Sequence, residues 1–112
     1  MTTRSKKKTK VEKVGVTVPA EVFAWLDEKG GNYIVQIELP GVEKKDIDLT
    51  MHEDLLSVRA DSKPYNATFI GHMHFPLKVN PKNAEATFKA GLLSMQIPVK
   101  EKRGPPTSIQ IK

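Results

Sequence analysis

His72 and His74 are the residues of this chain whose type and spacing come nearest to a metal site. Residues two apart on a strand share a face, so both imidazoles could reach one ion. The neighbouring sequence offers no evident third ligand, and an exposed polar strand face accounts for the pair without a metal. We therefore expect no metal to bind here.

Two other groups could do chemistry, but neither is complete. His52 precedes Glu53 and Asp54, yet no nucleophile accompanies this cluster, which is typical of a solvated turn. The segment Gly30-Gly31-Asn32 does not lead into a helix, as a phosphate-binding loop would. We expect no catalytic residue, no cofactor, no small-molecule substrate and hence no enzyme.

The net charge of +5 is concentrated in the first 16 residues, which hold six basic residues and one acidic residue. The run Lys6-Lys7-Lys8 could bind phosphates or acidic surfaces. No aromatic residue stands among these charges to stack on a base, which favours a solvated arm over a nucleic-acid site. We predict a disordered basic arm over residues 1–17 and do not expect nucleic acid as a partner.

Length and composition narrow the class further. A chain of 112 residues suits one domain, and the absence of cysteine excludes disulfides and thiolate chemistry. No segment approaches the roughly 20 apolar residues that span a bilayer. We expect a cytoplasmic protein with no membrane partner.

The elements that must position any site are strands, because apolar residues recur at every second position. Tyr33, Val35, Ile37 and Leu39 share one face, for example. The same pattern predicts strands over residues 22–26, 33–39, 47–51, 55–60, 67–75, 85–88 and 93–99, the first of them on an edge. Single helical turns are expected at 43–46 and 81–84. The fold class is therefore all-β, an immunoglobulin-like antiparallel β-sandwich over residues 18–99.

The last residues, 100–112, do not continue this pattern. Gly104-Pro105-Pro106 predicts a stiff, extended linker, and eight such residues reach roughly 25 Å at about 3.1 Å each. Beyond it stand Ile109 and Ile111, which point the same way in an extended chain and could fill two apolar sockets at a sheet edge. We predict a C-terminal extension that docks, either on a neighbouring molecule or back on its own domain.

Several motifs in order support a family resemblance. These are Tyr33-Ile-Val-Gln-Ile-Glu-Leu-Pro-Gly-Val42, Lys45-Asp-Ile-Asp-Leu49, Leu55-Leu-Ser-Val58, Phe75-Pro76, the Ala86-x-x-x-x-Gly-Leu-Leu segment and the final Ile-x-Ile. Together they resemble the α-crystallin domain of small heat-shock proteins over about residues 20–112. The resemblance implies an ATP-independent holdase chaperone that binds unfolding proteins, prevents their aggregation and self-associates.

The resemblance also suggests roles for particular residues. Ile109 and Ile111 would be the oligomerisation tail, and the groove that receives them would involve Ile47 and Leu49 on one strand and Ala84 and Ala86 on another. Small alanine side chains would leave space for the isoleucines. Ordinary core packing is the competing interpretation of Ile47 and Leu49.

This chain also departs from the family pattern. Only Asp61 to Asn66 stand where members usually carry a long loop with an exchanged strand, and six residues cannot supply such a strand. Gly71 occupies a position that often holds an arginine at the dimer interface. We expect small assemblies or edge-to-edge dimers through the strand that carries Phe69, Gly71 and Met73.

The sequence leaves a second class of function open. A co-chaperone adaptor of the CS type shares the sandwich and binds one defined protein partner, but it lacks a terminal Ile-x-Ile. The tail therefore favours the holdase.

Overall fold

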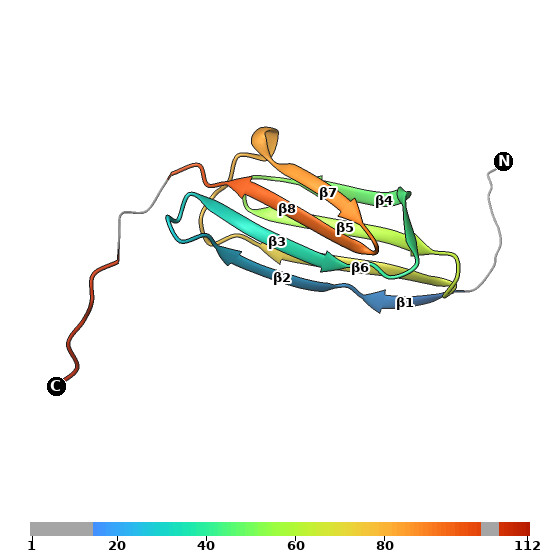
Figure 1. Ribbon diagram of the computed structural model, residues 1–112, viewed down its shortest axis with the longest axis horizontal. Helices are drawn as coiled ribbons and strands as arrows, with labels where there is room; N and C mark the ends of the chain where they lie inside the picture. Colours follow the sequence, from blue (N-terminus) through green and yellow to red (C-terminus); the bar gives the residue numbers. More distant parts are fainter. Residues whose placement is uncertain (1–14, 102–105) are drawn as a thin grey trace.

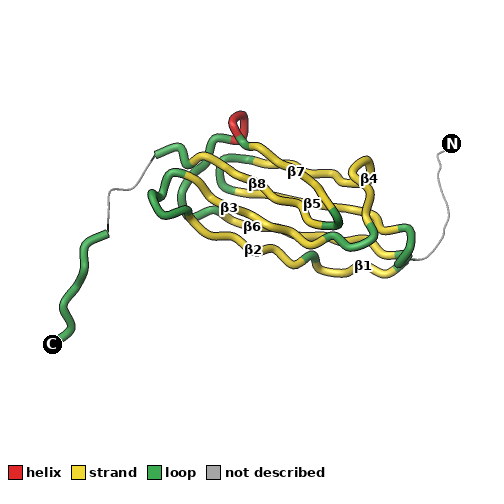
Figure 2. The backbone as a smooth tube through the Cα atoms, viewed as in Figure 1, coloured by secondary structure: helices red, strands yellow, loops and turns green. Residues whose placement is uncertain are grey.

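The computed structural model describes residues 15–101 and 106–112. These described residues form eight strands and one short 3-10 helix: β1 (Val16–Pro19), β2 (Glu21–Leu26), β3 (Asn32–Glu38), β4 (Val42–Met51), β5 (Leu55–Ser62), β6 (Ala67–His74), η2 (Pro81–Asn83), β7 (Glu85–Lys89) and β8 (Leu92–Pro98). Figure 2 shows that strands dominate and that η2 is a single turn. No helix in the described part of the chain has the length and apolar character needed to cross a membrane.

The strands form two four-stranded sheets, one in the order β1-β6-β5-β4 and the other in the order β2-β3-β8-β7. The two sheets lie face to face (Figure 1). The predicted antiparallel β-sandwich is confirmed, with one exception: β1 runs parallel to β6, pairing Val16 with Ala67 and Pro19 with Ile70. The chain passes from one sheet to the other at Ala20, whose N–H donates to the Ile70 carbonyl at 2.8 Å.

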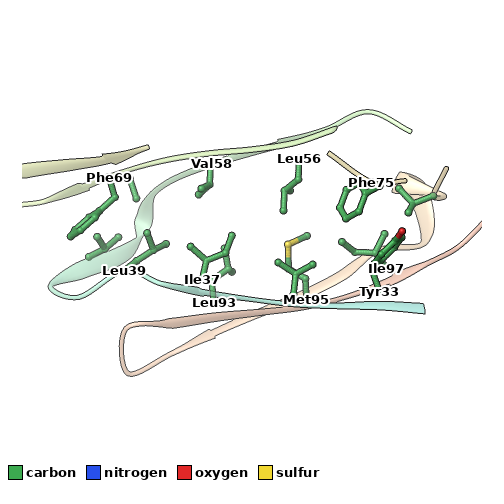
Figure 3. Close-up of a cluster of buried hydrophobic side chains, with 14 of the residues drawn as sticks. Tyr33, Ile37, Leu39, Leu56, Val58, Phe69, Phe75, Leu93, Met95 and Ile97 are labelled. Carbon is green, nitrogen blue, oxygen red and sulfur yellow. The ribbon is translucent and has the colours of Figure 1, made fainter. Parts of the chain in front are cut away.

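The core lies between the inner faces of the two sheets (Figure 3). Tyr33, Val35, Ile37 and Leu39 are buried, as the alternation predicted. The facing strands contribute further buried apolar side chains, among them Leu56, Val58, Phe69, Phe75, Leu93, Met95 and Ile97. Because every second residue of each strand points inward, two layers of alternating strands suffice to close this core.

β4 begins earlier than the sequence indicated. The helical turn expected at 43–46 is wrong, because those residues belong to β4, which starts at Val42 opposite Ser62 and contains a bulge before Ile47. Val42 is buried, which explains why the chain extends the strand rather than coiling there. The second expected turn is confirmed by η2, with Pro81 in its first turn.

The amino-terminal boundary also differs from the expected one. β1 starts at Val16, two residues before the domain boundary expected at residue 18. Residues 1–14, which make up most of the predicted basic arm, lie outside the described residues.

Candidate functional site: the β4–β7 margin and the C-terminal tail

Two outer strands lie along the same side of the sandwich. β4 ends one sheet and β7 ends the other, and both lie opposite the side formed by β1 and β2 (Figure 1). We call this side the β4–β7 margin; its inward-facing apolar residues are Ile47, Leu49, Met51, Ala84, Ala86 and Phe88.

Register places the β4 residues on the inner face. Ile47 lies opposite buried Ala60, and Leu49 lies opposite buried Val58. Directly opposed residues in an antiparallel pair share a face. Both side chains remain half-buried, however, because none of the strands formed by residues 15–101 and 106–112 lies on the outer side of β4. They therefore pack against the core and at the same time border solvent.

The alanines lie across from them. Ala86 of β7 is opposite Met95, which is buried, yet Ala86 itself is exposed. Ala84 follows η2, its N–H donates to the Pro81 carbonyl at 3.1 Å, and its side chain is half-buried against the core. Ala86 points inward but stays exposed, so no side chain of the other sheet covers it. Apolar surface is therefore accessible at this margin.

Two residues of the margin were missed by sequence reasoning. Met51 lies opposite Leu56, and Phe88 lies opposite Leu93, so both point inward and are half-buried. The alternation of apolar residues could have identified both. Met51 continues the series of Ile47 and Leu49, and Phe88 continues that of Ala86.

The tail does not cover the margin of its own molecule. Residues 106–112 have no secondary structure and extend away from the sandwich (Figure 1). Ile109 is 77% exposed and Ile111 is 93% exposed. Both branched aliphatic side chains are therefore exposed to solvent, and burying them would be favourable.

The point where the tail leaves the sandwich is fixed by several contacts. The Lys100 N–H donates to the Lys78 carbonyl at 2.7 Å, and Lys100 Nζ donates to Glu53 Oε2 at 2.7 Å. This hydrogen bond, reinforced by the opposite charge, lowers the pKa of Glu53 and raises the pKa of Lys100. The pair is about half-exposed, so it contributes little free energy.

The expected dimer edge has a different environment from the one predicted. β1 pairs with β6 from Ala67 to Ile70, so Phe69 lies in an inner strand and is buried. A Cβ added at Gly71 would lie 3.1 Å from Ala20 and 3.2 Å from Val22, so this position also faces its own chain. The prediction of a free edge at Phe69 is therefore wrong. Met73 is half-buried and lies beyond the end of β1, whose pairing with β6 stops at Ile70.

The three histidines do not belong to this margin's apolar lining. His72 and His74 are both exposed, opposite Ser57 and Leu55, and His52 is exposed in the turn before β5. Residues 15–101 and 106–112 contain no cluster of three or more His, Cys, Asp or Glu side chains that could hold a metal ion.

The architecture is a β-sandwich of two four-stranded sheets, followed by an extended tail that carries two exposed isoleucines. The model of the Hsp20/alpha crystallin family matches residues 25–112. This chain belongs to that family.

Curated relatives agree with this placement. "Small heat shock protein C2" of Rickettsia felis is 26% identical over 101 residues, covering 78% of this chain and 65% of the relative. "Alpha-crystallin" of Mycobacterium tuberculosis is 27% identical over 95 residues, covering 75% of this chain and 66% of the relative. The chain thus spans about two thirds of the length of these relatives.

Solved structures share the fold. Heat shock protein 16.0 from Schizosaccharomyces pombe superposes with a TM-score of 0.69 at 23% identity, covering 85% of this chain and 99% of that one. HspA from Xanthomonas axonopodis gives a TM-score of 0.66 at 17% identity, covering 77% of this chain and 98% of the other.

Proposed function

We propose that this protein is an ATP-independent holdase, which binds unfolding proteins and keeps them from aggregating. Membership of the small heat-shock family supports this function. The absence of a nucleotide-binding loop from the sequence is consistent with it.

Assembly through the tail is the second part of the proposal. Ile109 and Ile111 of one molecule occupy the β4–β7 margin of another, beside Ile47 and Leu49, with Ala84 and Ala86 leaving the room that the isoleucines fill. The observation that carries this is that one chain has two exposed apolar surfaces. Ile109 and Ile111 are 77% and 93% exposed, and the inward-facing residues of the β4–β7 margin are only partly covered.

The expected strength of this contact is modest. Burying two isoleucine side chains yields on the order of 3–6 kcal/mol before the cost of ordering the tail. A contact of this size forms and breaks readily, so subunits exchange. Exchange would expose apolar surface to clients without any input of chemical energy.

The holdase activity is tested with insulin whose disulfides are reduced by dithiothreitol, so that its B chain aggregates at constant temperature. The reductant leaves this chain unchanged, because the chain contains no cysteine. We expect equimolar protein to suppress light scattering in the absence of nucleotide. Aggregation that proceeds as in buffer, at any ratio up to a several-fold excess, would contradict the holdase.

The tail is tested with the double variant Ile109→Ala/Ile111→Ala. The matched control is Ser108→Ala/Gln110→Ala, which alters the opposite side of the same extended segment. We expect the isoleucine variant to sediment as smaller species than the parent and the control to sediment as the parent does. Identical distributions for all three proteins would exclude the docking role.

The margin is tested from its other side by Ala86→Tyr. Because Ala86 is exposed, we expect a larger side chain there to leave folding intact, and the ring would occupy the space proposed for an isoleucine. Thr87→Tyr is the control, because Thr87 is also exposed on β7 but points to the outer face. We expect only Ala86→Tyr to reduce the assembly, and an equal effect of both variants would argue against the margin.

A further inference from the structure

Each sheet has two outer strands, and three of the four described ones are protected against pairing. β1 is four residues long and ends in Pro19; β4 contains a bulge and the charged run 43–46; β7 has five residues and carries Glu85 and Lys89 at its ends. Short length, proline, bulges and charges are the usual means of keeping strand edges from joining other strands.

β2 has none of these protections. Its sequence is Glu-Val-Phe-Ala-Trp-Leu, its ladder to β3 is regular over all six residues, and Glu21 is its only charged residue. Phe23 is 48% exposed and Trp25 is 47% exposed. An edge of this kind is found covered in stable proteins.

The free hydrogen-bonding groups of β2 can be identified. The Asp27 N–H donates to the Asn32 carbonyl, so residues of the same parity, including Phe23 and Trp25, direct their backbone groups toward β3. The N–H and C=O groups of Val22, Ala24 and Leu26 therefore point away from the sheet. They form a row of three residues with no neighbouring strand in the described part of the chain.

We propose that β2 pairs in antiparallel fashion with β2 of a second copy, with the two-fold axis at Ala24. In this register Ala24 lies opposite Ala24 of the other copy, and Val22 lies opposite Leu26. These are the residues whose backbone groups are free, so each such pair exchanges two hydrogen bonds.

The side chains are complementary in the same register. On the outer face Phe23 lies opposite the other copy's Trp25, and the symmetry repeats this pair, so four aromatic rings surround the axis. On the inner face Val22, Ala24 and Leu26 are half-buried and apolar, so they meet residues of their own kind. Shifting the register by one residue would bring inner side chains opposite outer ones, which excludes the neighbouring alignments.

Acidic residues at the two ends of β2 limit the length of the proposed β2–β2 ladder. Glu21 would lie opposite the other copy's Asp27, whose carboxylate already accepts hydrogen bonds from Gly31 and Asn32. The like charges stop the pairing at Val22 and Leu26. The turn at 63–66 is too short to supply a strand that could cover β2 instead.

A single cysteine tests this register, because the full chain has none of its own. Ala24→Cys would place two Cα atoms about 5.5 Å apart across the axis, within the range for a disulfide. We expect mild oxidation to produce a covalent dimer. Val22→Cys is the matched control: its copies would be four residues apart along the strands, roughly 13 Å, and should not crosslink.

Oxidation of a mixture of two cysteine variants tests the same register without relying on Ala24→Cys. Val22→Cys and Leu26→Cys proteins, oxidised together, should form a heterodimer even though Val22→Cys alone does not. Crosslinking of Val22→Cys alone as fast as Ala24→Cys would indicate random collision and overturn the proposal. So would the failure of both Ala24→Cys and the mixture in proteins that keep the parent's circular dichroism.

Two further readouts complete the test. In the Ile109→Ala/Ile111→Ala background, Phe23→Lys should halve the mass measured by light scattering, whereas Thr87→Lys should leave it unchanged. Crosslinking of Ala24→Cys that appears only after deletion of residues 1–14 would show that the chain's own amino-terminal segment covers β2, and would refute self-pairing. Because the crosslinks do not depend on the tail or on clients, their outcome is separable from that of the holdase assay.

Discussion

The Tyr33 hydroxyl accepts a hydrogen bond from the backbone N–H of Leu77 at 3.2 Å, joining β3 to the loop that follows β6. The Tyr33 ring also packs against Phe75, with centroids 4.9 Å apart. The Tyr33 side chain therefore connects β3, in one sheet, to the loop that follows β6, in the other sheet.

Removing this hydroxyl should destabilise the protein. Tyr33→Phe leaves the Leu77 N–H without its acceptor, and we expect the free energy of unfolding to fall by about 1 kcal/mol. Urea unfolding at pH 7 measures the change. Tyr65→Phe is the control, because Tyr65 is 63% exposed, and it should differ from the parent by less than about 0.5 kcal/mol. Equal stability of Tyr33→Phe and the parent would show that the bond contributes nothing.

The β7–β8 turn contains a residue that is not ideal for it. Ala90 and Gly91 both have positive φ, 52° and 81°, as a two-residue hairpin turn of type I′ requires. Asparagine adopts this region at lower cost than alanine, so Ala90→Asn should raise stability by up to about 1 kcal/mol. Gly91→Ala should lower it by about 1–2 kcal/mol, although space is available there. Melting temperatures that move in the same direction for both variants would contradict this description of the turn.

Gly41 is required for a second reason besides its φ of 76°. A Cβ at this position would lie 2.5 Å from Ser62 Oγ and 2.9 Å from the Tyr65 ring. Gly30 has a similar φ of 71° but open space around it, so Gly30→Ala measures the backbone cost alone. We expect Gly41→Ala to cost about 1–3 kcal/mol more than Gly30→Ala. Equal losses, measured by urea unfolding, would mean that the crowding relaxes freely.

Asp27 makes part of the stability dependent on pH. Its carboxylate accepts hydrogen bonds from the Asn32 side chain and from the backbone N–H groups of Gly31 and Asn32, and these lower the pKa of Asp27. A lowered pKa contributes stability that is fully present above the usual value of about 4 and is lost as the pH falls through the lower value of the folded state.

Asp27→Ala should therefore melt at a lower temperature than the parent at pH 7, and the difference should shrink as the pH falls below about 4. Asp48→Ala serves as the control, because Asp48 is exposed on β4. A difference between parent and Asp27→Ala that stays constant from pH 7 to pH 2 would show that the charge is not involved.

Much of the fold could be predicted without coordinates, because a strand's period is a local property. The alternation of Tyr33, Val35, Ile37 and Leu39 identified the buried face correctly, and Pro40-Gly41 and Ala90-Gly91 marked turns that the structure confirms. The helical turn at 43–46 failed, because pairing between Val42 and Ser62 overrode the local preference of four charged residues.

For the candidate site, the sequence alone determined which side chains are apolar. It also determined that the chain has no cysteine and that Ile109 and Ile111 follow a Gly-Pro-Pro segment. Only the tertiary structure decided which strands are outer ones. It placed β1 beside β6, which removed the edge expected at Phe69, and it left β2 and the β4–β7 margin open. The physical reason is that periodicity specifies the face a residue occupies, whereas the neighbour of a strand is chosen by hydrogen bonds to residues far away in the chain.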